Sequence, residues 1–229
     1  ALQNALDDTT GQGAVSAPAV FTITVTGLND AVTLGAATAP AAVIELETAS
    51  NQNIAAITGS FAVNDADLGD TLVAVAAAPT VQLLDATGAP VTPTPGAIPV
   101  GLTAPGVFTL SALAASTGTA QSLGYTYDPA GVNLDFLREG ERLLVSYEVT
   151  VSDGTVTTAA QTVTFTIFGT NDRPVVSAVV NAASEANAGD AVTVLAGNFA
   201  ASDADRAAVL SYDVLLANRP AGFTLDAVA

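Results

Sequence analysis

The stretch TVTFTIFGTND occupies residues 162–172 and combines a strand pattern with an abrupt end. Its apolar side chains alternate with threonine, which predicts a strand with one buried face. Glycine, asparagine and aspartate then stop the pattern, and Pro174 stiffens the chain just beyond it. A similar stretch, VFTITVTGLND, occupies residues 20–30 at an offset of 169 − 27 = 142 residues. We therefore expect the chain to contain two copies of a domain end.

A second pair of matching segments supports an internal repeat. FAVNDADLGD, residues 61–70, matches FAASDADRAA, residues 199–208, at an offset of 199 − 61 = 138 residues. Solenoid units span about 20–45 residues, so this repeat has the size of a domain. The expected organisation is the C-terminal strands of one repeat (1–30), a complete repeat (31–172) and the N-terminal part of a third (173–229).

The complete repeat reads as strands and turns. Short alternating runs are separated by Gly, Pro, Asn and Asp, the residues that favour turns. Turns are expected at 85–88 and 152–154. The expected strands cover residues 43–47, 54–63, 72–75, 81–84, 107–113, 143–152 and 162–168. About seven such strands predict an all-β chain of tandem immunoglobulin-like or cadherin-like β-sandwich repeats.

The charge and composition exclude several function classes. The chain has 22 acidic residues, five basic residues and a net charge of −17, with no histidine or cysteine. Such a surface repels nucleic acid and anionic membranes, and no apolar run approaches the ~18 residues needed to span a bilayer. All five basic residues are arginine. Nucleophiles that depend on histidine, cysteine or lysine are therefore excluded, and we expect no enzymatic activity. A glycosidase with two carboxylates stays formally open, but acids that recur at loop ends favour a structural role.

Antiparallel strand order gathers the acids at the two ends of the sandwich. The loops after alternate strands lie at the same end, so acids far apart in sequence meet there. At the N-terminal end we expect Asn29, Asp30, Asp65, Asp67, Asp70 and Asp153. At the C-terminal end we expect Glu45, Glu47, Asp135, Glu139, Glu141, Asn171 and Asp172, joined by Asp203 and Asp205 of the next repeat.

So many carboxylates need a compensating cation. Like charges raise each other's pKa and destabilise the fold, and five arginines are too few to neutralise them. Calcium binds 6–8 oxygen ligands at about 2.3–2.6 Å, whereas magnesium prefers fewer carboxylates and more water. Without histidine or cysteine, zinc and copper sites are not expected. The acids therefore predict Ca²⁺ at both ends of the repeat.

Ordinary local structure offers alternatives for the same residues. Asp65 and Asp67 could form an Asx turn without a metal, and residues 134–142 could be a solvated turn with Arg–Glu pairs. Tyr125, Tyr127 and Tyr147 could line a sugar-binding platform, although tyrosines at strand spacing more often pack in a core.

Four motifs resemble a known family. NDADLGD (64–70), LDFLREGE (134–141), VSDG (151–154) and GTNDRP (169–174) resemble VCBS-type, cadherin-like repeats of large secreted bacterial surface adhesins. The resemblance implies an extracellular protein exported by a type I system, with calcium between domains. By analogy, the ligands at the second junction would be Glu47, Asp135, Glu139 or Glu141, Asp172, Asp203 and Asp205. The chain departs from the pattern at Ala208, where the first copy has Asp70.

The expected function is that of a calcium-stabilised, rigid extender in a long adhesin or biofilm matrix protein. Its partners would be neighbouring repeats or identical subunits, while other regions would contact a host surface or matrix polysaccharide. One alternative is the subunit of a filament or surface layer, joined head to tail by strand complementation. A second alternative is a carbohydrate-binding module, against which the absence of tryptophan counts.

Overall fold

The computed structural model describes residues 18–48, 52, 54–93, 96–129, 131–177, 198–213, 217 and 224. Residues up to Asp30 form one unit and residues from Ala31 onward form another. In the described part of the first unit, the strand expected within residues 20–30 is absent, and Phe21, Ile23 and Val25 are exposed. A single alternating segment cannot form a strand without a hydrogen-bonding partner. No helix in the described residues is long and apolar enough to cross a membrane.

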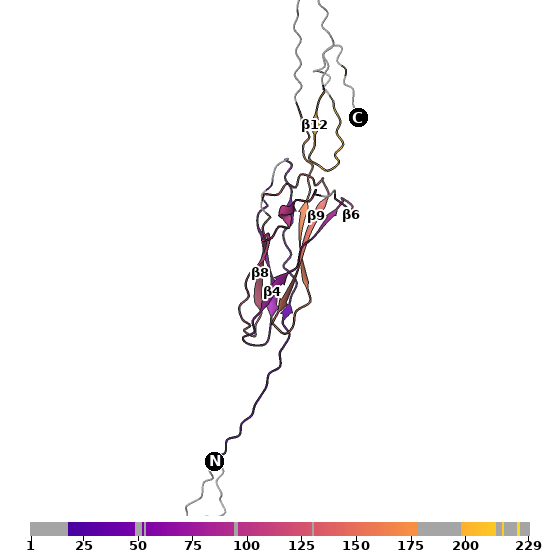
Figure 1. Cartoon of the computed structure of the whole chain (residues 1–229). Helices are drawn as coiled ribbons and strands as arrows, with labels where there is room; N and C mark the ends of the chain where they lie inside the picture. The colour runs from indigo at the N-terminus through magenta and orange to yellow at the C-terminus, as the bar shows by residue number, and fades with distance from the viewer. Residues whose placement is uncertain are drawn as a thin grey trace, which may run out of the picture. The chain divides into compact units, whose positions relative to one another are not determined.

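Residues from Ala31 onward contain two facing, mainly antiparallel sheets (Figure 1). One sheet has the order β1 (Thr33–Leu34), β3 (Ile57–Asn64), β8 (Gln121–Tyr127) and β7 (Phe108–Leu110). The other has the order β2 (Val43–Ile44), β10 (Gln161–Phe168), β9 (Arg142–Ser152), β5 (Thr80–Leu84) and β6 (Pro90–Val91), and β4 (Val73–Ala76) also pairs with β9. A short 3₁₀ turn, η1, spans Val100–Leu102. This order is that of an immunoglobulin-like sandwich and confirms the predicted fold class.

The first edge strand divides between the two sheets. Gly35 and Thr38 donate backbone hydrogen bonds to the carbonyls of Ala62 and Ser60 in β3, at 2.8 Å each. The chain then crosses over, and β2 pairs in parallel with the end of β10, with Val43 opposite Ile167. The strand expected over 43–47 is therefore only two residues long, because its pairing is set by this crossover.

Several other strands differ from the sequence expectation. The runs expected at 72–75 and 81–84 lie one after the other along β9 as β4 and β5. Pro79 lies between them, where its missing N–H cannot join the ladder. The strand expected over 107–113 is shortened to β7. We did not predict β8, although it pairs with seven residues of β3. Its polar flank and Gly124 weaken the alternating pattern.

The core lies between the sheets and contains most of the aromatic side chains. Phe165 in β10 stacks on Tyr127 with ring centroids 4.1 Å apart, and Phe108 stacks on Tyr147 at 4.3 Å. Tyr125, Tyr127 and Tyr147 are all buried. The tyrosines therefore pack the core, and the sugar-binding platform considered from the sequence is not formed.

The internal repeat is visible in strand pairing. In the complete domain, Thr33 lies opposite Asn64 and Gly35 donates to Ala62. Beyond it, β11 (Val175–Val176) pairs with β12 (Ala201–Ser202), with Val175 opposite Ser202. The numbers differ by 175 − 33 = 142 and 202 − 64 = 138, the same two offsets as in the sequence. The pairing of β1 with β3 thus recurs in the segment after Asp172.

A glycine in β3 leaves space for a buried tyrosine to reach the first part of the edge strand. The Tyr125 hydroxyl passes over Gly59 and donates to the Thr38 carbonyl at 2.7 Å. A Cβ atom at residue 59 would overlap the Tyr125 ring and the Thr38 hydroxyl. Close packing in this region therefore depends on the absence of a side chain at Gly59.

Gly59→Ala is expected to lower the free energy of unfolding by about 1–3 kcal/mol, the usual range for overpacking a buried site. Gly35→Ala is the matched control, since its Cβ would meet Ala62 at an ordinary 3.5 Å. Urea denaturation at fixed calcium concentration would measure both changes. Equal stability of the two variants would contradict this account.

Candidate metal centre

Three buried carboxylates from different parts of the chain meet at the C-terminal end of the sandwich. Glu45, Asp135 and Asp172 each place an oxygen within 4.8 Å of the others. Glu45 follows β2, and its N–H donates to the Phe168 carbonyl at the end of β10 at 2.9 Å. Asp135 lies in the loop before β9, and Asp172 follows β10. The three side chains are 2%, 3% and 0% exposed, so water cannot solvate their charges.

The protein satisfies only part of this carboxylate group. Glu45 Oε2 accepts a hydrogen bond from the Thr170 N–H at 3.1 Å, and Asp135 Oδ2 accepts one from the Asn133 side chain at 2.8 Å. Asp205 Oδ2 accepts from the Asp172 N–H at 3.0 Å. At this end of the sandwich, the buried carboxylate oxygens without a donor in the described residues are Glu45 Oε1, Asp135 Oδ1, Asp205 Oδ1 and both oxygens of Asp172. Buried carboxylate oxygens in this state need a proton or a cation.

Burial and neighbouring charges favour the protonated forms of Glu45 and Asp172 when no cation is bound. Burial raises the pKa of Glu45 to about 8, and the charges of Asp172, Asp135 and Asp205 add to this. The hydrogen bond from Thr170 opposes the rise. Burial likewise raises the pKa of Asp172 to about 6, together with the charges of Asp135, Asp205 and Asp203. A bound divalent cation would supply the missing positive charge.

The turn that starts at Asp203 brings the next segment to this group. The Asp205 N–H donates to Asp203 Oδ1 at 2.9 Å, which forms an Asx turn. Burial is the largest cause of the raised pKa of Asp205, and the charge of Asp203 contributes. Asp205 is 8% exposed and contacts the Asp172 backbone. The segment after Asp172 thus returns to the end of the sandwich.

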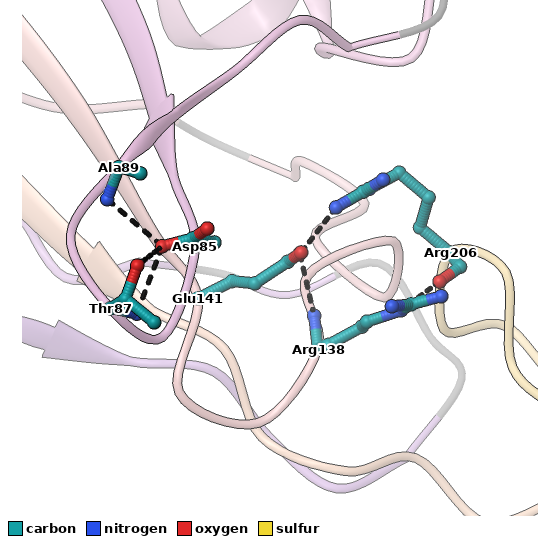
Figure 2. A network of polar contacts seen from close by, with 6 residues as sticks. All are labelled: Asp85, Thr87, Ala89, Arg138, Glu141 and Arg206. Atoms are coloured by element: carbon teal, nitrogen blue, oxygen red, sulfur yellow. Dashed lines mark hydrogen bonds and ion pairs between the residues drawn. The ribbon is translucent and has the colours of Figure 1, made fainter.

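Two arginines fix that turn against the loop before β9 (Figure 2). The Arg206 guanidinium forms an ion pair with Glu141 Oε1, and the Arg138 side chain donates to the Arg206 carbonyl. The Arg206 N–H donates to the Phe136 carbonyl at 3.3 Å. Glu141 Oε2 accepts from the Arg138 N–H at 3.2 Å, so both oxygens of Glu141 have protein donors. Glu141 therefore holds the turn in place, and its oxygens are not among those left for a cation.

The sequence pattern predicts Arg–Glu pairs only within residues 134–142, and the contact of Glu141 with Arg206 is an addition from the structure. The usable signal was the position of an arginine directly after the second Asp-Ala-Asp motif, where the first motif has Leu68.

Three further predicted residues lie at the surface nearby. Glu47, Glu139 and Asn171 are exposed and, with Thr170 and Arg173, line a pocket of about 280 Å³. The Asn171 side chain donates to the Asp172 carbonyl at 2.9 Å. The structure therefore places Glu47 and Glu139 beside the buried group and not within it.

A second, more open acidic cluster lies at the N-terminal end of the sandwich. Asp65, Asp67 and Asp70 have oxygens within 4.8 Å of one another. The Asp67 N–H donates to Asp65 Oδ1 at 2.9 Å, which forms the predicted Asx turn, while Asp65 Oδ2 is buried without a donor. Desolvation and the charges of Asp65, Asp67 and Asp153 raise the pKa of Asp70. The turn explains one oxygen of Asp65 and leaves the other for a cation.

The other residues predicted for this end have separate hydrogen bonds. Asp153 Oδ1 accepts from the N–H groups of Thr155 and Val156 at 2.7 and 2.6 Å, and its Oδ2 accepts from Val32 at 3.4 Å. Asp153 therefore closes the turn between β9 and β10. Asn29 and Asp30 are exposed residues of the N-terminal unit, where the Asn29 side chain donates to the Asp30 carbonyl at 3.1 Å.

The chemistry of the buried group fits a hard divalent cation. All of its free ligand atoms are carboxylate oxygens, which Ca²⁺ prefers over the nitrogen and sulfur ligands typical of zinc. Glu45, Asp135, Asp172 and Asp205 would hold such an ion, and the ion would neutralise their charges. The donor count leaves room for water or backbone oxygens to complete the usual 6–8 ligands.

Comparisons with known proteins identify no family for this chain. No family model matches the chain. No curated protein matches it either. Among solved structures it is similar to the ASH/PapD-like domain 7 of human CEP192, with 13% sequence identity and a TM-score of 0.28. That alignment covers 68% of this chain and 95% of the other. A similarity at this level tells nothing about function.

In chelator, the protein is expected to lose stability as the pH rises from about 5.5 to about 8.5. The folded-state pKa of Glu45, about 8, lies above its ordinary value of 4.5, so the folded state binds this proton more tightly than the unfolded state. The stabilisation is complete below about 4.5 and is lost as the pH rises through 8; Asp172 acts alike between 3.8 and about 6. Thermal melts across this range would measure it.

Calcium is expected to reverse this trend, because a cation binds the deprotonated carboxylates and its stabilising effect grows with pH. Melting temperatures in chelator that rise steadily toward pH 8.5 would contradict the raised pKa values.

Proposed function

We propose that this chain is a non-enzymatic structural module of a long extracellular protein, in which Ca²⁺ stabilises the junction between successive repeats. The observation that carries the proposal is the state of Asp172. It lies in the linker after the sandwich, is 0% exposed, and has no donor on either oxygen. A carboxylate in this state is stabilised by a proton or by a cation, and a cation is the better partner above the raised pKa of about 6.

The positions of the ligands explain what the cation would do. Glu45 and Asp135 belong to the sandwich, Asp172 to the linker, and Asp205 to the turn of the following segment. One ion held by all of them would draw these three parts together and resist bending at the junction. A series of such junctions gives a stiff rod, which suits an extender that projects an adhesive region or builds a matrix.

Calcium would also make the stability of the fold depend on whether the chain is inside or outside the cell. Without a cation, burial of the charges of Glu45 and Asp172 and their repulsion by neighbouring carboxylates oppose folding, as their raised pKa values indicate. A ligand that binds only the folded state stabilises it by RT ln(1 + [L]/Kd). The chain would therefore be weakly folded where calcium is scarce and firmly folded outside the cell, which supports the proposed extracellular location.

Catalysis fits the same residues less well. A glycosidase needs two carboxylates that face a sugar, but Glu45, Asp135 and Asp172 are at most 3% exposed. The buried tyrosines likewise offer no platform for a carbohydrate. Neighbouring repeats and other copies of the chain are therefore the proposed partners, in adhesion or matrix assembly.

Asp172→Asn is expected to abolish most of the rise in melting temperature that calcium gives the native chain. In chelator the same variant should melt at or above the native temperature, because it removes a buried like charge. Asp85→Asn is the matched control: Asp85 Oδ1 accepts from Thr87 and Ala89, which explains its lowered pKa without any cation. That variant should keep the full calcium response. Differential scanning calorimetry with calcium, magnesium and chelator would measure these shifts.

Identical melts of the native chain in calcium, magnesium and chelator would contradict the proposal. A calcium response that survives Asp172→Asn would place the cation elsewhere in the chain.

A further inference from the structure

The turn that carries Asp205 contacts the sandwich through groups that are not ligands of the candidate metal centre. The Arg206 guanidinium forms an ion pair with Glu141, and the Arg206 N–H donates to the Phe136 carbonyl at 3.3 Å. The Arg138 side chain donates to the Arg206 carbonyl (Figure 2). Arg206 therefore contacts the loop before β9 through its side chain, its N–H and its carbonyl.

The ion pair between Arg206 and Glu141 is largely shielded from water. The side chain of Arg206 is 26% exposed and that of Glu141 is 6% exposed. Solvent screens ion pairs on an open surface, whereas removal of one partner from a buried pair leaves the other charge uncompensated. Glu141 Oε2 accepts from the Arg138 N–H at 3.2 Å, so Arg206 supplies the charged partner of the other oxygen. Loss of Arg206 would thus weaken the contact between the turn and the sandwich.

The contacts of Arg206 position a carboxylate of the metal centre. Asp205 directly precedes Arg206, and Asp205 Oδ2 accepts from the Asp172 N–H at 3.0 Å. Asp205 Oδ1 is buried and has no donor among the described residues. Because Arg206 is held on the loop before β9, the neighbouring Asp205 is held beside Asp172. A ligand that is already in place binds an ion more tightly, since no free energy is spent on ordering it.

The other copy of this turn shows that the arginine is not needed for the turn itself. Leu68 takes the place of Arg206 there and is 79% exposed. Both turns nevertheless form the same Asx hydrogen bond at 2.9 Å. Arg206 therefore contributes contact with the sandwich, and leucine is a residue that this turn accepts.

We propose that Arg206 is a positioning residue, which docks the turn of residues 203–205 on the sandwich without calcium and so preforms the cation site. The inference rests on the proposed function for the nature of the ion, whereas the docking requires no ion. The guanidinium would also neutralise Glu141, so that Glu141 binds no calcium in the native chain. Calcium would then strengthen a junction whose orientation the arginine contacts already determine.

Distances between spin labels in chelator test the docking. The chain has no cysteine, so two introduced cysteines carry labels at unique positions. Val100→Cys labels η1 in the sandwich, and Val209→Cys labels the following segment; the native residues are 85% and 96% exposed. Pulsed EPR of this labelled chain in chelator is expected to give a narrow distance distribution. Addition of Arg206→Leu should broaden it, and saturating calcium should narrow it again.

Isothermal titration with calcium tests the effect on the cation site. If Arg206→Leu lowers the docked fraction to about one tenth, the apparent Kd for calcium rises about tenfold. The number of bound ions should stay the same, because a positioning residue is not a ligand. The double variant with Glu141→Gln should show the same rise, since its neutral side chain cannot bind an ion of its own.

The control Arg173→Leu removes the same charge from an exposed position in the linker. It should keep the narrow distribution and should not weaken calcium binding. A broad distribution for the labelled chain in chelator would overturn the proposal, as would a narrow one with Arg206→Leu or an unchanged Kd in that variant. A native chain that binds no calcium would contradict the proposed function, and the two distributions in chelator would then decide the docking alone.

Discussion

The stability of the C-terminal end of the sandwich depends on how the negative charge of its buried carboxylates is compensated, because water does not reach them. Glu45, Asp135 and Asp172 converge there from three separate segments, and the described chain offers them few donors. A group of this kind costs free energy unless protons or a cation join it. The linker at Asp172 and the turn at Asp203 to Asp205 contact this group, so their stability is linked to its charge state.

The junction contains directional contacts between side chains, and the proposed cation would add a less directional interaction. The contacts of Arg138, Glu141 and Arg206 are directional, and they set which part of the following turn meets the loop before β9 (Figure 2). A cation is much less directional, because calcium accepts varied coordination geometries. The arginine contacts therefore determine which part of the turn meets the loop, while the proposed cation would neutralise the buried carboxylates.

Strands with a long alternating pattern could be predicted from the sequence. β9 and β10 alternate over eight or more residues, and the strand positions they imply place Glu45, Asp135 and Asp172 at one end. Strands that form only through pairing with another strand could not be predicted from the sequence. Two-residue strands such as β1 exist only through pairing, and the run at 20–26 pairs with no strand among the described residues. The burial of Asp172 and the reach of Arg206 depend on the tertiary fold, which no local pattern encodes.

Comparison of the two Asp-Ala-Asp turns shows what the repeat keeps and what it varies. In both, the third residue donates its N–H to the first carboxylate at 2.9 Å, so the first aspartate fixes the turn. The next residue differs: Leu68 is 79% exposed, whereas Arg206 pairs with Glu141. The left-handed position then carries Gly69 in one turn and Ala207, with φ of 56°, in the other. An alanine in this conformation is strained, whereas a glycine is not. The turn therefore presents carboxylates in either copy, and the residue after it determines what the turn can contact.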